Sequence, residues 1–111
     1  MELINKTQIS TKLVKRIMRL AKVKADSSRL VISHDSSEGG KLGHYSSFLV
    51  EGVLEHRVNV SNEGDIITLG HELRHLAQNQ RLGVDRFNSM STDILEEDAE
   101  AFEAYLLNKG Y

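Results

Sequence analysis

Apolar residues recur at helical spacing in the first quarter of the chain, which predicts an amphipathic helix ending near Val23. Its apolar stripe consists of Leu13, Ile17, Leu20 and Ala21. Lysine and arginine occupy the other sides, as expected for a helix that lies over a sheet. Asn5, Thr7 and Ser10 are alternative caps for its start.

Three segments in the middle of the chain have the character of β-strands. Residues 29–34 predict a short strand, and residues 44–50 and 53–60 predict two more, joined at Glu51 and Gly52 by a two-residue hairpin turn. Polar residues and Gly39, Gly40 and Gly43 lie between the first two, and they do not match the phosphate-binding pattern GxxxxGK[ST]. Because residues 53–60 directly precede the next helix, they are a candidate edge strand for an extended peptide.

Helical spacing returns twice in the second half of the chain. Ile66, Leu69, Leu73 and Leu76 predict a helix that Ser61 or Asn62 caps and Gly83 ends. Residues 80–91 are expected to form a connecting loop. A last helix, capped by Thr92 or Asp93, extends to about Leu107 with Leu95, Ala99, Phe102 and Leu106 in its core stripe. The order of elements predicts an α+β fold in one domain, residues 1–111.

Composition narrows the possible functions. The net charge of −2 argues against a general nucleic-acid binder. Residues 1–25 nevertheless carry seven Lys and Arg against one Glu, and residues 91–111 carry one Lys against six acids. The chain has no cysteine, so disulfides and thiolate metal sites are excluded. No apolar run has the length of a membrane span, and we expect a cytoplasmic protein.

The segment LGHELRHL, residues 69–76, is the one place where residue type and spacing specify a chemistry. His71 and His75 are four apart, so on a helix their imidazoles lie on one face and can bind one metal ion. Glu72 is placed to accept a proton from a metal-activated water. This is the HExxH pattern of zinc peptidases; the alternative is a surface helix with two solvated histidines.

Two histidines leave a catalytic zinc ion one protein ligand short. A third histidine at the metzincin spacing is absent, since positions 78 and 81 are Gln and Arg. A carboxylate from the last helix is the natural supplier, because Glu96, Glu100 and Glu103 lie beside its core stripe. His34, His44 and His56 are expected to be surface or strand histidines, with His56 a weak candidate for lining the cleft.

Residues 96–100, EEDAE, together with HELRH, resemble the gluzincins, in which a glutamate on a later helix completes the zinc site. The continuation AFEAYLL is similar to the corresponding helix of ImmA/IrrE-type domains, and the short chain resembles a minigluzincin. The resemblance covers residues 60–107 and implies a small zincin-like domain: an N-terminal helix, a short three-stranded sheet, the HExxH helix and a glutamate helix. It implies that Glu96 is the third ligand, with Glu97 as the rival, and that Glu100 orients a ligand histidine. Arg74 and Glu100 depart from the family, where a small residue and Asp are common.

The first hypothesis is therefore a zinc-dependent peptidase that acts on a peptide or protein substrate, with Zn²⁺ on His71, His75 and Glu96 and with Glu72 as general base. Candidate donors to the oxyanion are Tyr45, His56, Arg86, Tyr105 and Tyr111. The alternative is a zinc-binding regulatory or interaction protein without proteolytic turnover. A third hypothesis, an adaptor for nucleic acid or membrane, uses the basic first helix and makes the histidine pair incidental.

Overall fold

A four-stranded sheet forms one layer of the protein in the computed structural model, which describes residues 1–35 and 42–111. The strands are β1 (Glu2–Asn5), β2 (Arg29–His34), β3 (Gly43–Val50) and β4 (Val53–Val60). Their spatial order is β1-β2-β4-β3. Both pairs made by β2 are parallel, and β3 runs antiparallel to β4. The two central strands are therefore β2 and β4, and β3 is an edge.

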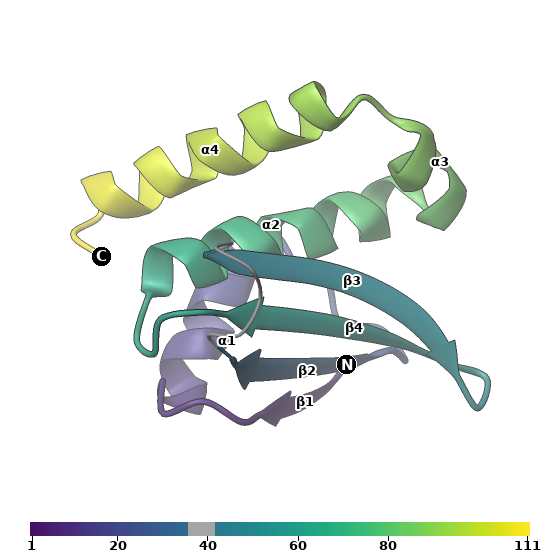
Figure 1. Ribbon diagram of the computed structural model, residues 1–111, viewed down its shortest axis with the longest axis horizontal. Helices are drawn as coiled ribbons and strands as arrows, with labels where there is room; N and C mark the ends of the chain where they lie inside the picture. Colours follow the sequence, from purple (N-terminus) through teal and green to yellow (C-terminus); the bar gives the residue numbers. More distant parts are fainter. Residues whose placement is uncertain (36–41) are drawn as a thin grey trace.

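The described residues form four helices: α1 (Thr11–Leu20), α2 (Ile66–Leu82), α3 (Val84–Ser89) and α4 (Thr92–Asn108). In Figure 1, α2 lies between the sheet and α4, and α1 lies behind the strands with its upper end at α2. Leu69, Leu73 and Leu76 of α2 are fully buried in the same hydrophobic cluster as Val14 and Ile17 of α1. The helices and the sheet thus share one core, and the α+β prediction is confirmed. None of the described helices is both long and apolar enough to span a membrane.

The alternation along β4 shows how the sheet contributes to this core. Val58 and Val60 are fully buried on the helical side, and His56 is 1% exposed on the same side. On the opposite side, Glu55 is shielded by Arg29 and Arg57, which are 3.4 Å and 2.6 Å from its carboxylate oxygens. The chain therefore buries one apolar face and covers part of the other with ion pairs.

The hairpin between β3 and β4 has the predicted turn. Glu51 and Gly52 have φ values of 52° and 80°, the left-handed region that a type I′ turn requires at both positions. Val50 pairs with Val53 across it, so the register of the two strands is fixed by the turn.

The sheet has one more strand than predicted. Glu2–Asn5 forms β1, which pairs in parallel with Arg29–Ile32 of β2. Four residues are too few to show an alternation, and the partner strand is distant in sequence, so only tertiary structure reveals the pairing. The first helix begins after Ser10, whose hydroxyl accepts from the Leu13 backbone N–H, and it ends at Leu20 rather than Val23.

Further predictions are wrong. Residues 53–60 form β4, which lies between β2 and β3, so it has no free edge for a peptide. Residues 84–89 form α3 within the segment expected to be a loop. Asp65 caps α2 in place of Ser61 or Asn62, whereas Gly83 ends it as predicted. The glycines at positions 39 and 40 lie outside the described residues.

Candidate metal centre

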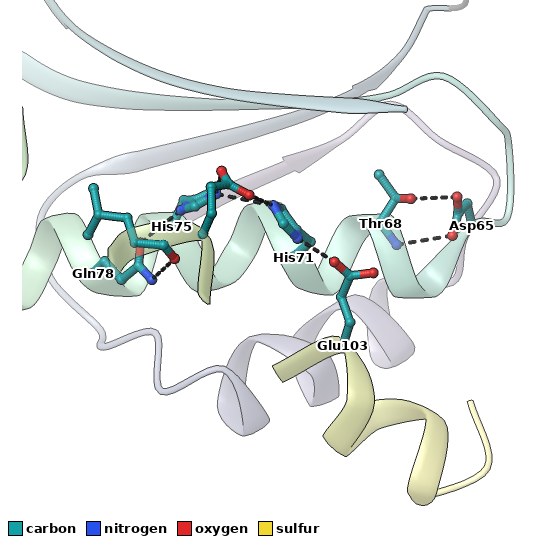
Figure 2. Close-up of polar contacts among 8 residues, drawn as sticks. Asp65, Thr68, His71, His75, Gln78 and Glu103 are labelled. Atoms are coloured by element: carbon teal, nitrogen blue, oxygen red, sulfur yellow. Dashed lines mark hydrogen bonds and ion pairs between the residues drawn. The ribbon is translucent and has the colours of Figure 1, made fainter. Parts of the chain in front are cut away.

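The N-terminal cap of α2 sets the direction in which the two motif histidines project. Asp65 accepts hydrogen bonds from the Thr68 backbone N–H at 3.0 Å and from its hydroxyl at 2.6 Å. Figure 2 shows this cap at one end of the helix and His71 and His75 farther along the same side. Because Leu69, Leu73 and Leu76 face the core, the histidines are held at its margin, next to α4.

The three sequence-predicted ligands lie together. The Nε2 atoms of His71 and His75 are 3.2 Å apart, and Glu96 of α4 places one carboxylate oxygen 3.0 Å from the first and the other 2.9 Å from the second. All three ligand atoms lie within 4.8 Å of one another. The histidine side chains are 16% and 10% exposed, and that of Glu96 is 41% exposed. This group of residues could hold a metal ion that remains reachable from solvent.

The other ring nitrogen of each histidine has its own partner (Figure 2). His71 Nδ1 is 2.6 Å from a carboxylate oxygen of Glu103, which has no proton to give when ionised. His75 Nδ1 is 2.8 Å from Oε1 of Gln78. The Gln78 amide nitrogen donates to the Leu95 carbonyl at 2.9 Å and to the Asp98 carboxylate at 2.7 Å, which fixes the amide so that its oxygen faces His75.

These partners determine the tautomer of both rings. Since Glu103 and the Gln78 oxygen only accept, each neutral histidine carries its proton on Nδ1 and turns the Nε2 lone pair toward Glu96. Two lone pairs and a carboxylate then face one another with no proton between them. Such a group of acceptors repels itself unless a proton or a metal cation lies among them. Without a metal, the surrounding carboxylates raise the pKa of His71 against the effect of burial. With both rings neutral, the donor set fits a divalent metal.

Glu72 is the charged group beside this centre. It is 7% exposed, and its carboxylate has no hydrogen bond or ion pair with a side chain or backbone group in the described parts of the chain. Burial raises the pKa of Glu72, although His71 and His75 act in the opposite direction. A carboxylate that is desolvated and lacks a fixed partner has the properties of a general base.

A pocket of about 620 Å³ opens over the centre. One wall is the start of β3 with His44 and Tyr45, and the opposite wall is built from α4 with Glu96 and Glu103. The apolar part of the lining includes Leu42, Phe87, Met90 and Leu95. His71, Glu72 and His75 form the floor between these walls, so a ligand in the pocket would meet all three.

Gly43 brings β3 close to the proposed base. A Cβ atom at this position would lie 2.6 Å from Thr68 Cγ2 and 2.9 Å from Glu72 Oε2. A side chain therefore does not fit there unless Glu72 moves. The strand edge and the buried carboxylate can approach each other only because residue 43 is glycine.

The resemblance suggested Glu97 as a rival ligand and Glu100 as the residue that orients a ligand histidine. Neither reaches the candidate metal centre. Glu97 and Glu100 are exposed, and the residue that orients His71 is Glu103. Glu103 follows Glu96 by seven residues, almost two full turns, so helical spacing alone places it on the face of Glu96. Arg74 does not crowd the pocket, because it pairs with Asp98 on another side of α2.

Of the oxyanion-donor candidates, only Tyr45 lines the pocket. Its hydroxyl accepts from the Asn79 amide at 2.8 Å and lies 2.8 Å from His56 Nδ1. Burial raises the pKa of Tyr45 to about 12, and burial lowers the pKa of His56. His44, which the strand pattern gave no role, lines the pocket near enough for its charge to act on Glu72.

The chain matches no protein-family model, no curated protein and no solved structure.

Proposed function

We propose that the protein is a zinc-dependent peptidase in which Glu72 is the general base. The observation that carries the proposal is the convergence of His71 Nε2, His75 Nε2 and the Glu96 carboxylate, while the other ring nitrogen of each histidine faces an acceptor oxygen. Histidine and carboxylate ligands in a group of three, with room for water, are typical of catalytic zinc. The resemblance of residues 60–107 to the gluzincins supports the same activity.

A zinc ion held by these residues would supply a water of lowered pKa and polarise the scissile carbonyl. Glu72 accepts the proton as the water oxygen attacks the carbonyl carbon. It then passes the proton to the amide nitrogen as the C–N bond breaks, so that an acid and an amine are released. Burial suits Glu72 to this exchange, because its raised pKa lies closer to neutrality than that of an exposed carboxylate.

The substrate would lie along β3, the edge strand beside the pocket. Because residues 50 and 53 close a two-residue turn, alternate residues of β3 pair with β4, and the backbone groups of Gly43, Tyr45 and Ser47 point to the free edge. An extended peptide can add to these groups as a further strand, with its carbonyl brought toward the metal ligands.

Glu72→Gln tests the proposed chemistry. The amide keeps the size of the side chain but cannot accept the proton, so cleavage of a broad set of unfolded proteins should fall by about two or more orders of magnitude. Zinc content, measured in the same preparations, should stay near one per chain. Glu97→Gln, the same change at an exposed position, is the control and should cleave at the wild-type rate.

A regulatory protein that keeps the metal without turnover gives a different result. Wild type would then bind zinc stoichiometrically, and neither it nor Glu72→Gln would cleave any member of the substrate set. If the wild-type protein binds no zinc, both the peptidase proposal and the regulatory alternative are overturned.

N-methylated peptides test the path of the substrate. If a peptide pairs with β3, methylation of its backbone nitrogens should block cleavage at every second position, since alternate N–H groups face the strand. If methylation at successive positions reduces cleavage equally, the peptide does not pair with β3.

A further inference from the structure

A second cleft, of about 200 Å³, lies between the end of α1, the outer side of α2, and α4. It is separate from the pocket over the metal ligands, with which it shares no lining residue. Its charged lining comes from three parts of the chain: Lys22 and Lys24 after α1, Arg74 and Arg81 on α2, and Asp98 on α4. Four cations and one acid therefore face a space of the size of a small anion.

The one acid in the cleft is already neutralised. Arg74 donates to Asp98 through Nε at 2.8 Å and through a terminal nitrogen at 3.2 Å, and its other terminal nitrogen donates to the Ala21 carbonyl. Lys22, Lys24 and Arg81 have no ion pair with any residue of the described ranges 1–35 and 42–111. The four cations thus exceed the one carboxylate of the cleft by three charges, which gives the cleft a positive potential that favours an anion.

The backbone at Lys22 gives an independent indication. Its φ is 69°, in the left-handed region where glycine is the usual residue after a helix. The N–H groups of Lys22 and Val23 donate to the carbonyls of Arg19 and Met18, the pattern of a Schellman motif. A lysine is strained there, and residues held in such a conformation tend to occur at functional sites. The segment is also anchored at Lys24, whose N–H and carbonyl both bond the Gln80 side chain at 2.9 Å.

We propose that this cleft binds a phosphate-sized oxyanion, either free phosphate or the phosphate group of a small molecule. Lys22, Lys24 and Arg81 supply the charge, and Arg74 is fixed at the base by Asp98. An extended polyanion such as duplex DNA is the other chemistry that a basic surface suggests. The small volume of the cleft favours the small anion.

Titration of the zinc-loaded protein with inorganic phosphate, followed by amide NMR at constant ionic strength, tests the site. Shifts should centre on residues 22–24, 74 and 81 and should saturate. Lys24→Gln/Arg81→Gln should weaken binding by about tenfold or more. Lys12→Gln/Lys15→Gln removes the same charge from exposed positions about 15 Å or less from Lys22 along α1, and it should bind as wild type does.

Lys22→Gly distinguishes a role of Lys22 in phosphate binding from a purely structural role. Glycine relieves the strained backbone, so the melting temperature should rise by about 2–4 °C while phosphate binding weakens. If Lys22 has only a structural role, stability changes and phosphate affinity does not, which overturns its part in the site. If the phosphate-induced chemical shifts do not saturate, or if both double variants lose phosphate affinity equally, the cleft is not the binding site. Binding of duplex DNA that both double variants weaken equally, with no phosphate binding, assigns the basic surface to nucleic acid.

Discussion

Helices α1 and α4 both pack on α2, but they depend on it in different ways. Figure 1 shows α1 behind the strands with its upper end at α2, and α4 alongside α2 on the side away from the sheet. The fully buried Val14 and Ile17 attach α1 to the common core with strands β2 and β4. Helix α4 has three buried residues, Ala99, Phe102 and Leu106, and its main neighbour is α2 alone. It carries Glu96, the third candidate metal ligand, as well as Glu103, whose carboxylate contacts His71 Nδ1.

The two helices meet α2 at the same glycine. A Cβ atom at Gly70 would clash with Leu106 of α4 and would lie 3.6 Å from Ile17 of α1. The difference is therefore in what else holds each helix. Both helices contribute buried side chains to the common core, but α4 is also held to α2 by the Arg74–Asp98 ion pair and by polar contacts at the candidate metal centre. A small protein can thus couple metal binding to the docking of one helix and leave the rest of the fold unaffected.

Loss of a metal ligand should have the largest effect, and it should affect α4 but not α1. His75→Ala or Glu96→Ala should lower zinc affinity by more than about 100-fold, because three protein ligands become two. Hydrogen exchange should then speed up in α4 and stay unchanged in α1. Glu97→Ala is the matched control and should keep the affinity. If Glu97→Ala loses zinc while Glu96→Ala retains it, the ligand is misassigned.

Truncation in each helix should separate core stability from metal binding. Leu106→Ala and Ile17→Ala both remove a fully buried side chain, and each should cost about 2–5 kcal/mol in the free energy of unfolding. Only Leu106→Ala should also reduce zinc affinity, since it loosens α4. Adding Gly70→Ala to Leu106→Ala should recover part of the stability, because the new methyl group fills the vacated space. Equal zinc affinity in the two single variants would contradict the different roles of the helices.

The residue that orients His71 should have a smaller effect. Glu103→Ala removes the acceptor for the His71 Nδ1 proton and should weaken zinc binding by about 10- to 100-fold. Glu100→Ala, one turn away on the exposed side, should leave the affinity unchanged. The opposite result would restore the orienting role that the family resemblance gives to Glu100.

The smallest effect concerns the ion pair that ties α4 to α2. Hydrogen bonds from Arg74 lower the pKa of Asp98 below its usual 3.8. Because the pKa of Asp98 is lower in the folded than in the unfolded chain, its ionisation stabilises the fold at pH values above the unfolded-state pKa. This contribution is lost as the pH falls below about 4. Because Asp98 is partly exposed, the gain should be under about 1 kcal/mol. In metal-free protein, the stability difference between wild type and Asp98→Asn should therefore shrink between pH 5 and pH 2.5; a constant difference would contradict it.

The sequence alone determined the local features of this protein. The period of apolar residues located β2, β4, α2 and α4, and the HExxH spacing placed both histidines on one helical face. These features depend on neighbours within a few residues, which the chain itself specifies. The turn at Glu51 and Gly52 belongs to the same class, since it follows from which residues tolerate positive φ.

Tertiary structure alone decided which strand lies at the edge of the sheet and which glutamate contacts His71. Strand β4 became central because β2 pairs with it from the other side, a contact between segments more than twenty residues apart. The resemblance placed Glu96 at the metal, but it could not show that Glu103 rather than Glu100 faces His71. That choice depends on how α4 is rotated against α2, and the packing of Leu106 on Gly70 contributes to it. Gln78 gained its role in the same way, because its amide is oriented by groups that only the folded chain brings beside it.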